Sequence, residues 1–400
     1  MNIYLKQEKF HRVTFKKYYV SKMKKEELTI RTLLCYYQEL ACHKYYNESL
    51  QTYILGKNYD ARFNVHLKKV GTYIIIEYSL SSVDPLYIND PNYTIDVLEE
   101  LFNELIIPRF WNKKCVKSLF DRAKEIYESD LYSRFENPSM LSFENAIKHF
   151  YKGTIRDYDS YGSLEALYKI TEKDLYNYYM KVINEESVCI ASGNFIKENK
   201  YDYNLTCKDN FYFLEKGNYS PFMYKDFESD QCYLEVIYDT GVYSLDKLGI
   251  AARALNFIFG GKSASNLFNI VREKYGLCYS ISSMYLGASG IIIVSSIINY
   301  SDIDKVLEAI DEAYNKIGNL DFDIDEIKEY FISNIINSKD NFNTLVDNYF
   351  LDNYFLKDNE SYKELEKIDK LKIEDIKEVF KNTKRSFVYA YGGKKNDWFL

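Results

Sequence analysis

An internal repeat at about half the chain length constrains the fold more than any other feature of the sequence. The segment "YGSLEALYKITEKDLYNYY" starts at Tyr161, and the similar segment "YKELEKIDKLKIEDIKEVF" starts at Tyr362. Four identical pairs are each separated by 201 residues in a chain of 400: Tyr161 and Tyr362, Leu164 and Leu365, Glu165 and Glu366, Asp174 and Asp375. Each segment runs on into an apolar strand that ends at glycine. Self-similarity at a fixed period indicates a duplicated structural unit, so we expect two homologous domains.

The same repeat predicts the fold class. Each copy reads as an amphipathic helix that opens near Thr171 or Lys372, with acidic residues in its first turn, followed by a β-strand. Further helices are predicted over residues 94–107 and 303–317, the second capped by Gly318, and strands over 72–80 and 232–241. Runs of strands with runs of helices predict an α+β fold in which each domain is a mostly antiparallel sheet with helices packed on one face.

The predicted domain boundaries follow from a polar stretch near the middle of the chain. We expect an N-terminal domain over residues 1–205, a linker over 206–229 that contains Pro221, and a C-terminal domain over 230–400.

Charge and composition exclude several classes of function. The formal net charge of -7 argues against binding to a phosphate backbone, so no nucleic-acid partner is expected. The apolar runs have strand length and the first residues do not form a signal peptide, which predicts a cytoplasmic protein that does not enter a membrane. The seven cysteines contain no C-x-x-C pair, and we expect them to be reduced.

Candidate catalytic groups are scarce. None of the four histidines is within four residues of another, so the zinc-peptidase pattern of two histidines on one helical turn is absent. Cys35, Glu39, Cys42 and His43 have the spacing i, i+4, i+7 and i+8, which would place them on one helical face as an unorthodox zinc site or as core residues. The "GGKS" at Gly260 lacks the earlier glycine of a phosphate-binding loop.

The stretch "GGKSASNLFNIVREKYGLCYSISS" from Gly260 to Ser283 is the strongest candidate for a binding site. Ser263 or Ser265 can cap a helix that Gly276 ends before a strand. Arg272 in the last turn and Tyr279 on the strand would then lie at one rim, where they offer hydrogen-bond donors to a peptide carbonyl or an oxyanion. The alternative is an ordinary surface arginine with a half-buried tyrosine.

This stretch, extended to "LNFIFGGKSASNLFNIVREKYGLCYSISS", resembles the C-terminal-domain signature of the insulinase-like (M16, pitrilysin) zinc peptidases. In that signature a Gly-Gly turn precedes a helix with Leu-Phe, followed by Arg-Glu-Lys, Gly-Leu and Tyr-Ser. The segments "FNELIIPRF" at Phe102 and "YGSLEALYKITEKDLYNYY" at Tyr161 are also similar to this family, so the resemblance covers most of the chain.

The chain departs from the family where the catalytic zinc is bound. The family's His-x-x-Glu-His motif falls on Thr32, Cys35 and Tyr36, and the further glutamate ligand falls near Ser118. The resemblance therefore implies that this chain binds no metal and has no catalytic residues of its own. It also implies that Arg272 and Tyr279 match the arginine and tyrosine that contact substrate from the C-terminal domain.

The resemblance implies a function as the non-catalytic subunit of a heterodimeric M16 zinc peptidase. The partner would be an M16 homologue that carries the zinc motif, and the substrate would be a peptide, such as a leader peptide in natural-product maturation. Inactive alone, the chain would help to enclose and bind the peptide. Two alternatives stay open: a catalytically inert structural or peptide-binding homologue, and a solitary enzyme that uses Cys35, Glu39 and Cys42 or His43 as zinc ligands.

Overall fold

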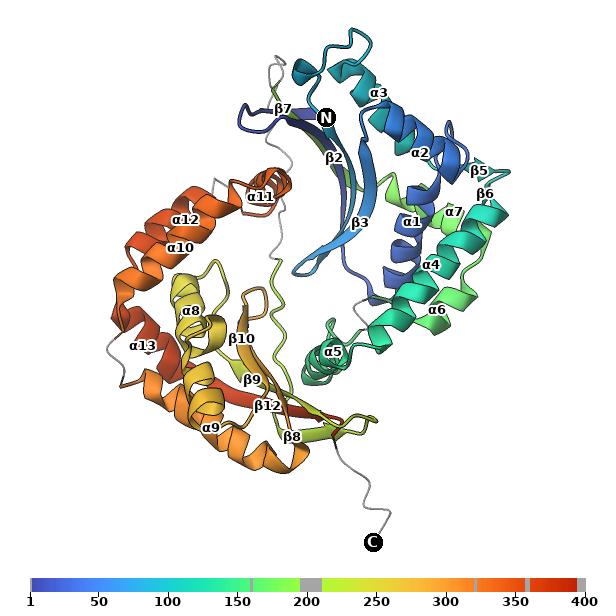
Figure 1. Ribbon diagram of the computed structural model, residues 1–400. Coiled ribbons are helices and arrows are strands. Elements are labelled where there is room, and N and C mark those ends of the chain that lie inside the picture. Colours follow the sequence, from blue (N-terminus) through green and yellow to red (C-terminus); the bar gives the residue numbers. More distant parts are fainter. Residues whose placement is uncertain (1, 159–160, 195–210, 320–321, 357–359, 394–400) are drawn as a thin grey trace. The chain divides into compact units, whose positions relative to one another are not determined.

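A computed structural model describes residues 2–158, 161–194, 211–319, 322–356 and 360–393 (Figure 1). Residues 206–210 of the predicted linker lie outside this description. The chain forms two compact units. Unit 1 comprises Met1–Ser133, Asp159–Phe211 and Lys339–Asp358, and unit 2 comprises Arg134–Tyr158, Tyr212–Ser338 and Asn359–Leu400.

Unit 1 contains a five-stranded sheet, sheet 1, in the order β1-β7-β2-β4-β3. β1 pairs in parallel with β7, and the other neighbours are antiparallel. The strands are β1 (Asn2–Lys6), β2 (Arg12–Lys22), β3 (Arg62–Val70), β4 (Tyr73–Val83) and β7 (Glu186–Gly193).

Unit 2 repeats this topology in its own five-stranded sheet, sheet 2, whose order is β8-β12-β9-β11-β10 when read from the parallel edge. β8 pairs in parallel with β12, and the remaining pairs are antiparallel. The strands are β8 (Ser220–Lys225), β9 (Cys232–Asp239), β10 (Ser280–Leu286), β11 (Ile291–Ile298) and β12 (Lys384–Tyr391). The predicted α+β fold with two homologous, mostly antiparallel domains is confirmed.

Most helices of unit 1 cover one face of sheet 1 (Figure 1). Alternate strand residues such as Phe15, Ile76 and Leu80 enter the core between this face and the helices. The helices are α1 (Leu28–Leu40), α2 (Glu48–Lys57), α3 (Ile95–Leu105), α4 (Lys117–Phe135), α6 (Leu164–Lys169) and α7 (Glu172–Val182), with a hairpin of β5 (Phe110–Trp111) and β6 (Lys114–Cys115).

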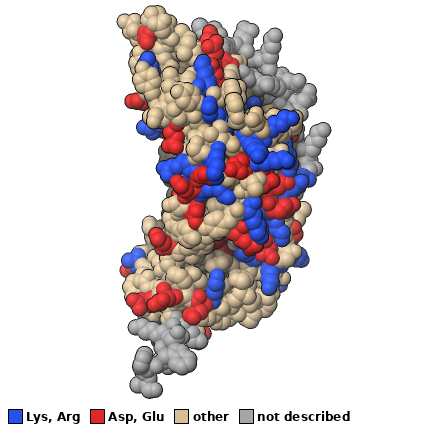
Figure 2. Space-filling view, turned by 90° about the vertical axis from the view of Figure 1, so that its right-hand side faces the viewer, with Lys and Arg blue, Asp and Glu red and all other residues tan. Residues whose placement is uncertain are grey.

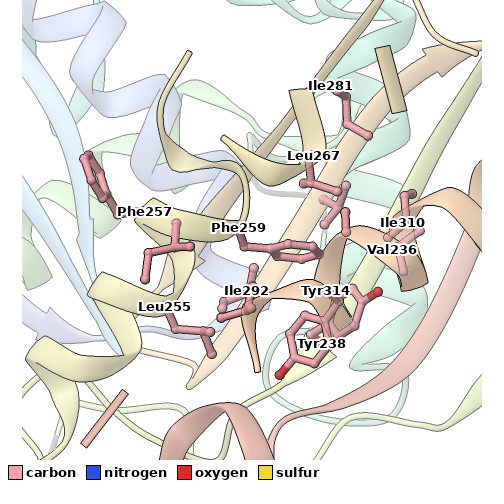
Figure 3. Close-up of a cluster of buried hydrophobic side chains, with 14 of the residues drawn as sticks. Val236, Tyr238, Leu255, Phe257, Phe259, Leu267, Ile281, Ile292, Ile310 and Tyr314 are labelled. Carbon is pink, nitrogen blue, oxygen red and sulfur yellow. The ribbon is translucent and has the colours of Figure 1, made fainter. Parts of the chain in front are cut away.

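Unit 2 has the corresponding helical layer on sheet 2. Its core is built around aromatic contacts: Phe259 meets the rings of Tyr238 and Tyr314 edge-on at 5.4 and 5.2 Å (Figure 3). The helices are α8 (Gly249–Asn256), α9 (Ile303–Ile317), α10 (Ile324–Ser338), α12 (Glu360–Asp369) and α13 (Ile373–Asn382), with π-helical segments η3 (Phe257–Gly261) and η4 (Phe268–Lys274).

The predicted helix ends agree closely with the structure. Thr171 caps α7 in a capping box with Asp174, and α13 begins directly after Lys372. α9 has the predicted bounds, but Gly318 ends it with a right-handed φ of -60°. A Cβ at Gly318 would lie 2.9 Å from the ring of Phe380, so close packing rather than a left-handed turn favours glycine there.

The second face of each sheet is covered by a helix from the other half of the sequence. α11 (Phe342–Tyr354) brings Val346, Phe350 and Tyr354 onto the face of sheet 1 that is opposite its helical layer. α5 (Pro138–Phe150) brings Ala146 and Phe150 onto the equivalent face of sheet 2. The compact units therefore differ from the sequence halves by these two exchanged helices.

A network of charges fixes α11 on sheet 1. The Asp347 carboxylate of α11 accepts hydrogen bonds from Lys16 at 2.6 Å, Lys68 at 2.7 Å and the Tyr18 hydroxyl at 3.0 Å. Lys16 is also 3.0 Å from Glu77, and both of these side chains are buried. Burial alone would raise the pKa of Asp347, but the ammonium groups of Lys16 and Lys68 hold it below its usual range.

The exposed surface carries charges of both signs. On the face shown in Figure 2, lysine and arginine are interspersed with aspartate and glutamate. Within the part of the chain that the structure describes, no helix is both long and apolar enough to cross a membrane.

We predict that Asp347→Asn destabilises the protein by about 3 kcal/mol, because it leaves the buried Lys16 charge without one of its partners. Urea unfolding at neutral pH would measure the loss. The matched control is Asp340→Asn, which removes the exposed ion pair with Lys9 and should cost less than about 1 kcal/mol. The Asp347 contribution is present above the pKa of the unfolded chain and is lost as pH falls through the lowered folded pKa. Equal losses in the two variants would contradict this account.

Candidate functional site

The segment that carries Arg272 and Tyr279 is a helix, a glycine turn and a strand within unit 2. The helical part includes η4, and the strand is β10, which forms one edge of sheet 2. Ser265 is buried and its hydroxyl accepts the Phe268 N–H at 3.4 Å, so Ser265 provides the predicted N-terminal cap.

Gly276 ends this helix as predicted. It has a φ of +64°, its N–H donates to the Arg272 carbonyl at 2.9 Å, and the following Leu277 N–H donates to the Val271 carbonyl at 3.0 Å. These bonds satisfy the last helical carbonyls, and glycine adopts the left-handed conformation at no steric cost. Arg272 is thereby placed in the last turn, as the sequence predicted.

Gly260, at the end of η3, allows β10 to lie against the helices. A Cβ at Gly260 would be 2.5 Å from Leu267 and 2.6 Å from the Ser283 hydroxyl. The Ser283 hydroxyl also donates to the Asn256 side chain at 2.8 Å, which ties β10 to α8. Glycine at position 260 is therefore required by close packing and not by phosphate binding.

Arg272 and Tyr279 both present their side chains to solvent. The Arg272 guanidinium lies 5.1 Å from the centre of the Phe268 ring, and its side chain is 47% exposed. Tyr279 is 60% exposed and precedes β10 by one residue, with its N–H bonded to the Ile297 carbonyl at 2.9 Å. The Arg272 side chain also lies 4.0 Å from the exposed Glu273 carboxylate. The backbone of each residue is fixed, while its polar tip is accessible from solvent.

A half-open pocket of about 440 Å³ adjoins the end of this helix. Tyr275 and Leu277 form one wall, and residues of α9 form the other. Across it, Glu312 accepts hydrogen bonds from Lys274 and from the Tyr275 hydroxyl, both at 2.7 Å.

The three positions on which the resemblance places the zinc motif lie on α1, and the side chains present there make other contacts. The Thr32 hydroxyl bonds the Leu28 carbonyl at 2.8 Å, and the buried Cys35 thiol points to the Arg31 carbonyl at 3.4 Å. Burial raises the pKa of Cys35 to about 12, so its thiol stays protonated at neutral pH and is a poor nucleophile.

Tyr36 connects α1 to α4. Its ring stacks on Tyr127 with centroids 5.1 Å apart, and its hydroxyl donates to the Asp130 carboxylate. Nothing in the sequence indicated the contact between Tyr36 and Asp130, and the resemblance placed the downstream glutamate ligand near Ser118. Ser118 is exposed in the first turn of α4, whereas Tyr127 and Asp130 lie one helical turn apart and meet Tyr36.

The alternative zinc site at Cys35, Glu39, Cys42 and His43 required these residues to share a helix. α1 ends at Leu40, and Ala41 is extended, so Cys42 and His43 lie beyond the helix. Cys42 is buried in a bridge to Pro108, and His43 is exposed. No group of three or more potential metal ligands occurs among the described residues.

Comparisons with known proteins agree with the resemblance seen in the sequence. Residues 207–331 match the family model described as the Peptidase M16 inactive domain. The chain is 21% identical to the probable inactive metalloprotease YmfF of Bacillus subtilis (strain 168) over 337 residues, which cover 81% of this chain and 79% of that protein.

Two solved structures have the same fold along almost their whole length. A conserved protein from Enterococcus faecalis V583 superposes with a TM-score of 0.88 at 22% identity, covering 99% of this chain and 97% of that one. A peptidase M16 inactive domain from Pseudomonas fluorescens gives a TM-score of 0.74 at 14% identity, with coverage of 98% and 96%. The predicted family resemblance is confirmed.

We predict that Thr32→His with Tyr36→His creates a zinc site on α1. Two histidines at i and i+4, together with Asp130, would supply three ligands of the kind that zinc prefers. The purified double variant should bind zinc at least about tenfold more tightly than the wild type, measured by competition with a chromophoric chelator.

The control adds Asp130→Asn to the same double variant, which should reverse most of the gain because it removes the carboxylate ligand. If the gain persists without the carboxylate, Asp130 does not occupy the position of the third ligand.

Proposed function

Since this chain is a homologue of the M16 peptidases, of the inactive type, we propose that it is the non-catalytic subunit of a heterodimeric zinc peptidase in the cytoplasm. The partner is an M16 homologue that carries the zinc motif, and the substrate is a peptide. One class of substrate that fits is the leader peptide removed during natural-product maturation.

The observation that carries this proposal is the contrast between α1 and the Arg272–Tyr279 segment. On α1 the motif positions are occupied by a threonine, a buried thiol and a phenol bonded to Asp130. In unit 2, Arg272 and Tyr279 are exposed on a segment fixed by a buried cap, a glycine turn and close strand packing. Exposed donors on a rigid frame are suited to binding a peptide carbonyl or an oxyanion.

The edge strand β10 supports a peptide-binding role. It pairs only with β11 in sheet 2, and its Ser280, Ser282 and Met284 are exposed. A peptide that adds to this edge as a further strand would pass beside Tyr279, with main-chain hydrogen bonds that do not depend on its sequence. Arg272 would then bind a carbonyl of that peptide, while the partner supplies the zinc-bound water.

Reconstitution with the zinc-motif homologue from the same genome tests the proposal. Size-exclusion chromatography with light scattering would show whether a mixed species forms, and a fluorogenic peptide assay of each fraction would show which species cleaves. Cleavage by the mixed species alone is the expected result. If no mixed species forms and no fraction cleaves, the chain is a structural or peptide-binding homologue instead.

We predict that Arg272→Ala with Tyr279→Phe slows peptide turnover by the mixed species at least about tenfold, because one charged and one neutral hydrogen bond to the substrate are lost. The elution volume and mass of the complex should not change. Both measurements use the same purified fractions.

A matched control is Lys274→Ala with Tyr275→Phe, which alters the same helix end but leaves Arg272 and Tyr279 intact. Lys274 and Tyr275 are both bonded to Glu312 and the proposal gives them no contact with the peptide, so turnover should stay within about twofold of the wild type. Equal effects of the two double variants would refute the assigned roles.

A further inference from the structure

A single carboxyl group is buried in the apolar layer between sheet 2 and α5. Glu235 lies on β9, the central strand, and only 2% of the residue is exposed. Its side chain points to the α5 face, because Leu234 and Val236 on either side enter the core of the helical layer. The surroundings on the α5 face are mostly apolar, with Ile237, Ile293, Phe387 and Phe150.

The groups that face Glu235 come from three elements. From β11, the Ser295 hydroxyl donates to the carboxyl at 2.5 Å, and from β12, Tyr389 is its cross-strand neighbour. From α5, the buried Ser142 hydroxyl donates to the Tyr233 carbonyl at 3.4 Å and also lowers the pKa of the nearby carboxyl. His149, also on α5, stacks on Tyr389 with centroids 5.6 Å apart. Within the described residues, no ion pair reaches Glu235.

Tyr389 and His149, the titratable neighbours of Glu235, do not change their charge above pH 7. Burial raises the pKa of Tyr389, so its hydroxyl stays neutral. Burial, together with Lys225, Lys152 and Lys148, lowers the pKa of His149, so its ring is neutral above pH 7. Burial raises the pKa of Glu235 itself to about 8, which makes it the group in this layer that changes charge in the physiological range.

Unit 1 has a different buried charge on its central strand. Lys16 lies on β2, the central strand of sheet 1, also on the face covered by the exchanged helix, and it is paired with Glu77 and Asp347. The α11 contact is thus made between compensated charges. The α5 contact instead encloses a carboxyl with no counter-charge, and such burial favours the protonated form.

We propose that the docking of α5 on sheet 2 depends on pH. The helix is docked while Glu235 is protonated and is increasingly released as pH rises. When α5 lifts away, the carboxyl reaches water and ionises, and the apolar face that includes Ile237, Ile293 and Phe387 is uncovered. This inference does not depend on the proposed peptidase function.

The direction and range of the effect follow from linkage. In the released state Glu235 has an ordinary pKa of about 4.3, whereas in the docked state its pKa is raised. Between these two values the docked state binds one more proton, so docking weakens about tenfold for each pH unit. The decline begins above the ordinary pKa, continues to about pH 8, where the docked carboxyl itself ionises, and levels off above that.

Hydrogen exchange with mass spectrometry on the full chain, between about pH 6 and 9.5, tests whether the docking of α5 depends on pH. The rates are corrected for the intrinsic exchange rate at each pH. The opening constant of residues 138–150 in α5 should rise about tenfold per pH unit up to about pH 8 and then level off. Residues 342–354 in α11 are the internal control and should show no such rise.

Two variants test whether the ionisation of Glu235, and not merely its packing, controls the opening of α5. In Glu235→Gln the opening of α5 should become independent of pH, while the surface control Glu329→Gln should keep the wild-type profile. In Ser295→Ala the loss of a donor to the carboxylate should move the plateau to higher pH. A flat wild-type profile for α5, or an unchanged slope in Glu235→Gln, would overturn the proposal.

Discussion

The exchange of α5 and α11 is the constraint on which the rest of the structure depends. A β-strand presents alternate residues to opposite faces of its sheet, so a helical layer on one face leaves the other face unburied. In sheet 1 that other face contains Tyr18, Val20, Ile75 and Ile190, all buried by α11. In sheet 2 the equivalent face is buried by α5. Neither sheet would be fully covered by the helices of its own half of the sequence.

The two exchanged contacts have different chemistry in spite of their common origin. Lys16 and Asp347 hold α11 with charges that compensate one another, which favours a constant contact across neutral pH. Glu235 under α5 has only hydroxyl donors, so the energy of that contact includes the cost of keeping a carboxyl neutral. The two units share their topology but differ in the charged group that is buried on the central strand.

The sequence predicted those parts of the fold that depend on local or periodic signals. The repeat at Tyr161 and Tyr362 predicted two homologous domains, and the serine cap and Gly276 predicted the frame of Arg272 and Tyr279. These predictions succeeded because caps, turns and amphipathic periods act within one helical turn of the residues concerned.

Contacts between distant segments were not predictable in the same way. The exchange of α5 and α11 joins residues from opposite halves of the chain. Nothing in the local sequence of either helix indicates which of the two sheets it packs on. The hydrogen bond between Tyr36 and Asp130 joins α1 to α4 across a separation of 94 residues, and no local signal in the sequence indicates it. The proposed zinc set with Cys42 and His43 failed because α1 ends at Leu40, where no glycine or proline marks the end.

The α1 positions Thr32, Cys35 and Tyr36 and the segment with Arg272 and Tyr279 are held by separate sets of contacts. Tyr36 and Tyr127 fill the space between α1 and α4 with an aromatic stack, so the packing of unit 1 needs no metal. Arg272 and Tyr279 are held by Ser265, Gly276 and the contact of β10 with α8, all within unit 2. Because the two places share none of these supports, a substitution at Thr32, Cys35 or Tyr36 leaves the contacts that hold Arg272 and Tyr279 intact.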